Sequence, residues 1–145
     1  MQERTTPGPG SIGMLLNHAA RAVMQRHGDA LRTLGLDEHM WIMIQNIRFS
    51  GELGAEPNDA ADRVRISRGV LIDAAERLVR DGWAQPAPGR PVSAGYLVLT
   101  KKASDILPGL DTQVTWVIEH ATNGFTHDEV EALAGYLTRI IDNMA

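Results

Sequence analysis

The basic residues of this sequence are concentrated in its middle third. Residues 61–102 carry eight Lys and Arg against four acidic residues, or +4, whereas residues 1–60 carry −2 and residues 103–145 carry −6. The distribution of the field, more than the net charge of −4, sets the attraction for phosphate. The first chemistry that the sequence offers is therefore binding to a polyanion such as nucleic acid, with a solvated run of charges as the alternative.

Position divides these basic residues into two expected roles. In a helix-turn-helix the first turn of the second helix enters the major groove, which places Ser67, Arg68 and Gly69 nearest to base edges. Arg68 could bond to guanine through two donors. Arg90 lies on a tip of Pro, Gly and Ala that can approach a narrow groove closely. The expected phosphate contacts are Arg65, Arg77, Lys101 and Lys102, with exposed helix-end charges as the alternative.

Catalytic chemistry has little support in the sequence. The tripeptide at 127–129, His-Asp-Glu, resembles a metal or acid–base cluster, but neighbouring residues on a helix point in different directions. Its acids also fit a helix capping box. The sequence has no cysteine, no His-x-x-x-His spacing, no Ser-His-Asp order and no phosphate-binding glycine loop. We therefore expect a protein that is not an enzyme and that uses no metal or cofactor.

The apolar residues that must position these groups recur at helical spacing through most of the chain. Asp37 and Ser67 are placed to cap the second and fourth helices, and Thr126 opens the capping box of the last. Gly35 is placed as the stop of the first helix. The expected helices cover approximately residues 12–34, 38–50, 58–64, 68–80, 101–121 and 127–141.

A tight turn between the third and fourth helices is typical of a helix-turn-helix. Ala60, Ala61 and Val64 of the third helix are expected to face inward. Residues 83–99 then read as a hairpin with a Pro/Gly-rich tip. The predicted fold is mostly α with a small β-hairpin wing: a winged helix-turn-helix lobe at residues 36–100, flanked by dimerisation helices at 11–35 and 101–145.

The flanking helices are expected to form a homodimer. The first helix is apolar on more than one side and has roughly 23 residues, and helices that long in a short chain usually bury against a partner subunit. Residues 1–10 hold two Pro-Gly pairs and almost nothing apolar, so we expect a flexible arm before a single domain at 11–145. Charges interrupt every apolar stretch, and the absence of cysteine fits a reducing compartment, so we expect a cytoplasmic protein without a membrane span.

Three local motifs give this chain a resemblance to the MarR family of bacterial transcription regulators. They are Leu36-Asp37-Glu38-His39-Met40-Trp41 at the start of the second helix, Glu76-Arg77-Leu78-Val79-Arg80-Asp81-Gly82-Trp83 before the wing, and Leu99-Thr100-Lys101-Lys102-Ala103 after it. Together with the order of the elements, they extend the resemblance over nearly the whole chain.

Departures from the family pattern fall on the surface that would read DNA. The Asp-x-Arg pair usual in the wing is absent, because Pro91 and Ser93 occupy its positions; Arg90 is our candidate replacement. Asp73 occupies an arginine-like position and would repel phosphate. A turn position that is often glycine is Arg65.

The resemblance implies a sequence-specific regulator that binds a pseudo-palindromic operator in double-stranded DNA, a repressor relieved by a small aromatic or anionic effector. The residues we would test for the effector are His18, Arg21, His39 and Trp41. His18 and Arg21 lie one turn apart, which suits anion capture but is also common on surfaces, and Trp41 in an apolar stripe is usually core. The alternative function is a winged-helix protein that has lost DNA reading and binds another protein.

Overall fold

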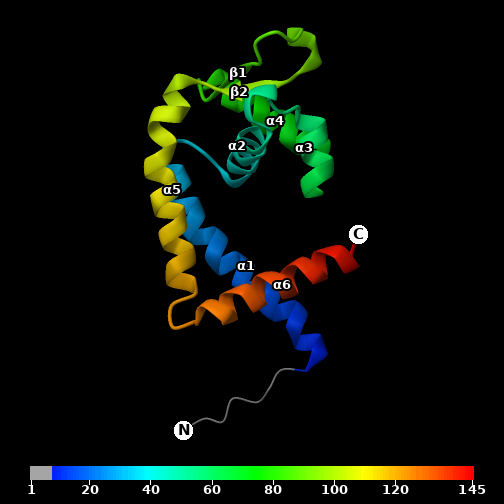
Figure 1. Ribbon diagram of the computed structural model, residues 1–145, viewed down its shortest axis with the longest axis vertical. Helices are drawn as coiled ribbons and strands as arrows, with labels where there is room; N and C mark the ends of the chain where they lie inside the picture. The colour runs from blue at the N-terminus through cyan, green and yellow to red at the C-terminus, as the bar shows by residue number, and fades with distance from the viewer. Residues whose placement is uncertain (1–7) are drawn as a thin grey trace.

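A computed structural model of the protein describes residues 8–145; residues 1–7 of the expected arm lie outside this part. The described residues form six α-helices and a two-stranded antiparallel hairpin (Figure 1). The predicted mostly α fold with a β-hairpin wing is confirmed. In chain order the elements are α1 Pro9–Arg32, α2 Glu38–Ser50, the 3₁₀ turn η1 Gly51–Leu53, α3 Pro57–Val64, α4 Arg68–Arg80, β1 Ala84–Pro86, the 3₁₀ turn η2 Val92–Ala94, β2 Leu97–Leu99, α5 Lys101–Ala121 and α6 His127–Asn143.

The molecule has a lobe at one end and long helices at the other. Helices α2, α3 and α4 and the hairpin form the lobe, while α1 packs along α5 and leads away from it (Figure 1). Helix α6 turns back so that the C-terminus lies below α3 (Figure 1). Helix α4 and the hairpin are thus carried at the end of two long, paired helices.

One hydrophobic core holds the lobe together and continues into the junction of α1 and α5. Its largest fully buried side chains come from the four helices α1, α2, α4 and α5: Leu31, Met40, Met43, Ile44, Ile47, Leu71, Leu78 and Leu107. Burying one such side chain contributes roughly 1.5–3 kcal/mol. The apolar stripes of α2 and α4 therefore fix the position of α4 within the lobe.

Local capping sets the starts of α2 and α6 and the end of α1 as the sequence predicts. The Asp37 carboxylate accepts a hydrogen bond from the Met40 amide at 2.9 Å, and Thr126 and Glu129 form the complete capping box. Gly35 has a φ of +72°, and the following amide of Leu36 bonds to the Leu31 carbonyl at 3.1 Å, so the chain leaves α1 in a left-handed turn.

Three local predictions are wrong. Helix α1 begins at Pro9 rather than after Ser11, because proline fits the first helical position and Gly8 is the cap residue; residues 9 and 10 therefore belong to a helix and not to an arm. Ser67 occupies the cap position of α4 without forming a side-chain capping bond. Val64 is 36% exposed, whereas Ala60 and Ala61 are buried as expected, since α3 ends just at Val64.

Helix α6 has no buried residue anywhere along its length. Its exposed apolar side chains form one stripe at helical spacing: Val130, Leu133, Tyr136, Leu137, Ile140 and Ile141. Helices α1 and α5 add exposed apolar side chains of their own, among them Leu15 and Trp116. An apolar surface of this extent on a small chain indicates that a second surface covers it.

Candidate nucleic-acid interface

The turn of the helix-turn-helix is a left-handed residue followed by a short extended link. Arg65 has φ 59° and ψ 45°, and it is the one residue other than glycine with a positive φ among residues 8–145. The Ile66 amide bonds to the Ala61 carbonyl at 3.0 Å and closes this turn. A β-carbon is disfavoured in this conformation, which explains why glycine is common at such a position.

The first turn of α4 is open to solvent. Ser67, Arg68 and Gly69 are all exposed, whereas Leu71 behind them is fully buried. A β-carbon added at Gly69 would meet only the Ser67 hydroxyl, at 3.9 Å. Nothing in the described chain covers this helix end, so base edges could approach its backbone closely.

The wing is a short hairpin held to the lobe by a third segment. Ala84 pairs with Leu99, and Pro86 pairs with Leu97. On the other side of Leu97, Ala55 forms two backbone hydrogen bonds of 2.8 and 2.9 Å. Gly54 precedes it with φ +78°, and a β-carbon there would lie 2.7 Å from the Leu97 carbonyl oxygen. Glycine is thus required where the loop before α3 meets the wing.

Arg68 forms a two-bond ion pair with Asp62 across the helix-turn-helix. Its Nε donates to Oδ1 at 2.9 Å and its Nη2 donates to Oδ2 at 2.6 Å. Both side chains remain exposed, at 62% for Arg68 and 56% for Asp62. The hydrogen bond from Arg68 lowers the pKa of Asp62, so the carboxylate stays ionised at neutral pH.

Arg77 connects the last turn of α4 to the start of α2. Its guanidinium bonds to Asp37, the cap of α2, and its Nε donates to Asp73 at 3.0 Å. Partial burial raises the pKa of Asp37, but the Met40 amide and the Arg77 guanidinium outweigh that effect and leave the pKa below its usual value. The placement favours a structural role for Arg77 over the expected phosphate contact, and it offsets the charge of Asp73.

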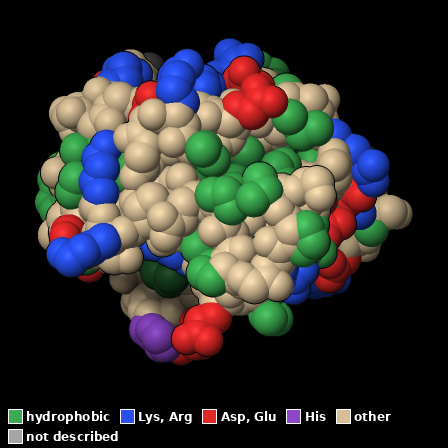
Figure 2. Space-filling view, turned by 90° about the horizontal axis from the view of Figure 1, so that it is seen from above, with side chains coloured by type: hydrophobic (Ala, Val, Ile, Leu, Met, Phe, Trp, Pro, Cys, Tyr) green, Lys and Arg blue, Asp and Glu red, His purple; other side chains and the backbone are tan. Residues whose placement is uncertain are grey.

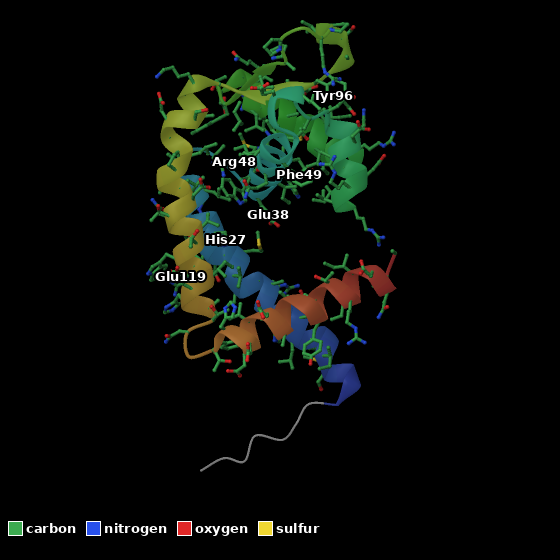
Figure 3. All side chains as sticks on the ribbon, viewed as in Figure 1. His27, Glu38, Arg48, Phe49, Tyr96 and Glu119 are labelled. Atoms are coloured by element: carbon green, nitrogen blue, oxygen red, sulfur yellow. The ribbon has the colours of Figure 1, made fainter. Side chains whose placement is uncertain are left out.

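The other expected DNA contacts also have partners within the chain. Arg65 donates to the Met144 carbonyl at 2.9 Å, and the Arg90 guanidinium carbon lies 3.8 Å from the centre of the Tyr96 ring, at the base of the wing (Figure 3). Lys101 pairs with Asp105 at 2.9 Å. Lys102 donates to the Asp81 carbonyl at 2.7 Å, and its ammonium lies 4.5 Å from the Trp83 ring centre.

The lobe end of the molecule has no single block of positive charge. Figure 2 shows Lys and Arg side chains spread around the edge of this face, with acidic side chains among them and hydrophobic side chains at its centre. Exposed apolar residues of α4 include Val70, Ile72 and Val79. Such a surface attracts phosphate only weakly. Any selectivity for a DNA sequence would then depend on individual side-chain contacts.

The expected effector residues do not form one site. His18 and Arg21 are exposed on α1, and His39 is half-buried at the start of α2. Trp41 is 7% exposed, belongs to the core and carries the Arg48 guanidinium over its ring, so it is closed to a ligand in this structure (Figure 3). A groove of about 490 Å³ lies instead between α1 and α5, lined by Arg26, Asp29, Ala30, Thr33, Thr112, Gln113, Trp116 and Val117.

Sequence reasoning missed three ion pairs that hold the basic side chains of the lobe. Asp62 holds Arg68, Asp37 holds Arg77, and Asp111 of α5 binds Arg48 of α2 through two bonds of 2.7 and 2.9 Å. The two partners of the Arg77 bond are 40 residues apart and those of the Arg48 bond 63 apart. Only the pair of Arg68 with Asp62 could have been suspected from the sequence, because Asp62 precedes Arg68 by six residues and lies on the helix before the turn.

The described residues contain no group of three or more His, Asp or Glu side chains placed to hold a metal ion. Among the helices of the same part of the chain, none combines the length and the apolarity needed to cross a lipid bilayer.

Comparison with solved structures decides the fold. A MarR transcriptional regulator from Methanosarcina mazei Go1 superposes with a TM-score of 0.80, covering 94% of this chain and 91% of the other at 18% identity. A MarR-family regulator from Rhodococcus sp. RHA1 gives 0.76 at 14% identity, covering 94% and 96%. A mutant MarR from E. coli complexed with operator DNA gives 0.73 at 21% identity, covering 89% and 92%. The chain has the MarR fold.

The sequence itself carries this similarity only weakly. No model of a known protein family matches the chain, and no curated protein matches it. In the MarR fold of this chain, α4 is the helix that the sequence predicts to read bases, and the hairpin is the predicted wing. The MarR fold therefore accounts for the order of elements, and the individual contacts must be argued from this chain's own side chains.

Proposed function

We propose that this protein is a sequence-specific regulator of transcription that binds double-stranded DNA as a homodimer and is not an enzyme. The observation that carries the proposal is the exposed first turn of α4, with Arg68 at its start, beside a hairpin wing. The likeness to a MarR that is complexed with operator DNA supports the same function. A helix-turn-helix dimer binds two half-sites about one helical turn apart, so we infer a pseudo-palindromic operator.

The homodimer is inferred from the exposed apolar stripes of α1, α5 and α6. Obligate dimers bury more than about 2,000 Å² in total and have more apolar interfaces than transient complexes. Helix α6 is capped at its N-terminus and has a continuous apolar stripe, yet it buries nothing within its own chain. These features support a second copy as its cover.

The expected phosphate contacts remain part of the proposal, with roles weighted by their surroundings. Lys101 and Lys102 are exposed at the start of α5 and can exchange their internal partners for phosphate. Arg90 can leave the Tyr96 ring to enter a narrow minor groove. Arg77 contributes least, because it is half-buried and held by two carboxylates.

We further infer repression relieved by a small molecule. The open groove between α1 and α5 supports an aromatic or anionic ligand, since the Arg26 guanidinium and the Trp116 ring both line it. His18, Arg21 and His39 stay as predicted contacts to be tested beside Arg26. Replacing Arg26 by Ala should weaken the release of DNA by such a ligand and leave DNA binding in its absence unchanged.

Selection of bound fragments from genomic DNA across salt concentrations tests the main proposal. A regulator enriches a few sites, and its affinity falls steeply with salt as counterions are released. Binding without enrichment, or no binding at all, favours the alternative of a winged-helix protein that binds another protein. This alternative is tested because the lobe face mixes Lys and Arg with acidic side chains and has no single basic surface for DNA.

A further inference from the structure

Asp62 and Arg68 are joined in a geometry that leaves one edge of the guanidinium free. A guanidinium has five N–H donors in a plane, on Nε, Nη1 and Nη2. The carboxylate of Asp62 takes the Nε donor and one Nη2 donor. The remaining donors on Nη1 and Nη2 form the outer edge of the fork, which matches the spacing of two adjacent acceptors.

The two candidate ligands of this edge differ in what they require. A phosphate is attracted by net positive charge, and the ion pair between Arg68 and Asp62 has none. Glu56 and Asp59 add further negative potential, and both act on Arg68 through their charge. A guanine instead offers O6 and N7 as neutral acceptors in the major groove, and two parallel donors recognise them by geometry. The ion pair therefore disfavours phosphate and keeps the base contact.

The surroundings of the pair allow a base edge to reach it. Arg68 is the first residue of α4, and its neighbours Ser67 and Gly69 are small and exposed. The pair itself is more than half exposed on both sides. Because two bonds hold the guanidinium in the free protein, less side-chain freedom is lost when the base binds.

We propose that Asp62 is a positioning residue that directs Arg68 to a guanine in each half-site and away from the phosphate backbone. The proposal rests on the proposed function and deepens it, since it names the base read by the start of the recognition helix and the residue that sets this choice.

The test uses the full chain and a random-sequence duplex library at fixed salt. The wild type is expected to enrich a guanine at one position of each half-site. Replacing that guanine by 7-deazaguanine, which keeps the base pair but lacks the N7 acceptor, should weaken wild-type binding about tenfold or more. The same replacement should have no effect on Arg68→Ala.

Asp62→Asn removes the charge and breaks the two-bond pair. It should lower the preference for guanine at that position about tenfold, while raising affinity for random duplexes and steepening the salt slope by up to about one unit as Arg68 turns to phosphate. A loss of folding would lower both affinities together. Asp62→Glu, which keeps a carboxylate, should recover part of the guanine preference.

Asp59→Asn is the matched control, because it removes the same charge from α3 and acts on Arg68 only through that charge. It should raise affinity for random DNA and leave the guanine preference intact. The proposal is overturned if Asp62→Asn keeps the wild-type preference or changes it no more than Asp59→Asn does. If the wild type enriches no sequence, the proposed function fails as well.

Discussion

The lobe buries its apolar residues within one chain, whereas α6 at the other end buries none. The cations of the lobe also have partners inside the chain, as in the pairs of Arg68 with Asp62 and Arg77 with Asp37. The core of the lobe is complete within one chain, together with the ends of α1 and α5 that pack on it, while α1 and α6 present apolar surfaces that the proposed dimer would cover. We therefore expect substitutions in the core and substitutions in the stripe of α6 to affect different properties of the protein.

The largest expected effect comes from placing a charge in the stripe of α6. Leu137→Asp should weaken self-association by about a thousandfold or more, because a carboxylate would lose its hydration in an apolar interface. Leu137 is 39% exposed in the single chain, so the substitution should leave the lobe folded. Sedimentation equilibrium measures the association.

Arg139→Asp puts the same residue on the opposite face of α6 and serves as the control; it should remain dimeric. A wild-type chain that sediments as a stable folded monomer at micromolar concentration would remove the basis for the contrast between the two regions.

The second effect tests the lobe. Leu78→Ala should lower the free energy of unfolding by about 2–5 kcal/mol. Leu78 is fully buried on the inner face of α4, and its truncation leaves a cavity in the core. Urea unfolding at one fixed protein concentration measures it, because dimerisation makes stability depend on concentration. Val79→Ala, on the exposed side of the same helix, should cost less than about 1 kcal/mol. Equal losses in the two variants would contradict the described core.

A smaller effect concerns the bond between Asp37 and Arg77. Asp37→Asn keeps a good helix cap but loses the ion pair, and should cost about 0.5–1 kcal/mol at neutral pH. The pKa of Asp37 is lowered in the folded state, so its contribution is complete above the unfolded pKa of about 3.9 and disappears as pH falls through the folded value. The difference in unfolding free energy between wild type and variant should therefore shrink below about pH 4. A difference that stays constant down to pH 2 would show that Asp37 is not the titrating group.

The smallest effect on stability is expected at the exposed end of α5. Lys101 is 89% exposed, and surface pairs like the one with Asp105 contribute about 0–1 kcal/mol. Lys101→Ala should leave unfolding nearly unchanged, yet weaken binding to all DNA sequences alike and reduce the salt slope by about one unit. Titrations at several salt concentrations measure this, with Lys102→Ala for comparison. A change in base preference in Lys101→Ala would contradict a phosphate role.

Features set by neighbouring residues could be predicted from the sequence. The cap at Asp37 and the box at Thr126 depend on residues within one turn, and the buried stripe of α2 depends on helical spacing alone. The start of α1 is not predicted correctly, because both a hydroxyl at Ser11 and a proline at the first helical position fit a helix start. Local patterns therefore gave the elements and most of their ends.

Features set by distant side chains could not be predicted. Whether Arg77 faces phosphate or the cap of α2 depends on how closely α2 packs on α4, and no spacing within one helix reports that. The sequence is compatible with Trp41 either in the core or in contact with a ligand, and only its burial in the structure decides between these roles. The partners of Arg68 and Arg90 likewise follow from the path of the turn and the wing.

Thr100 lies where the wing, the recognition helix and α5 meet. Its hydroxyl accepts from the Ala103 amide at 3.2 Å and donates to the Gly82 carbonyl at 2.6 Å, while its own amide bonds to Trp83 at 3.1 Å. A tilt of α5 would therefore carry α4 and the hairpin with it as one body. In the proposed dimer, such a motion would change the distance between the two copies of α4 and leave the residues at their first turns unaltered.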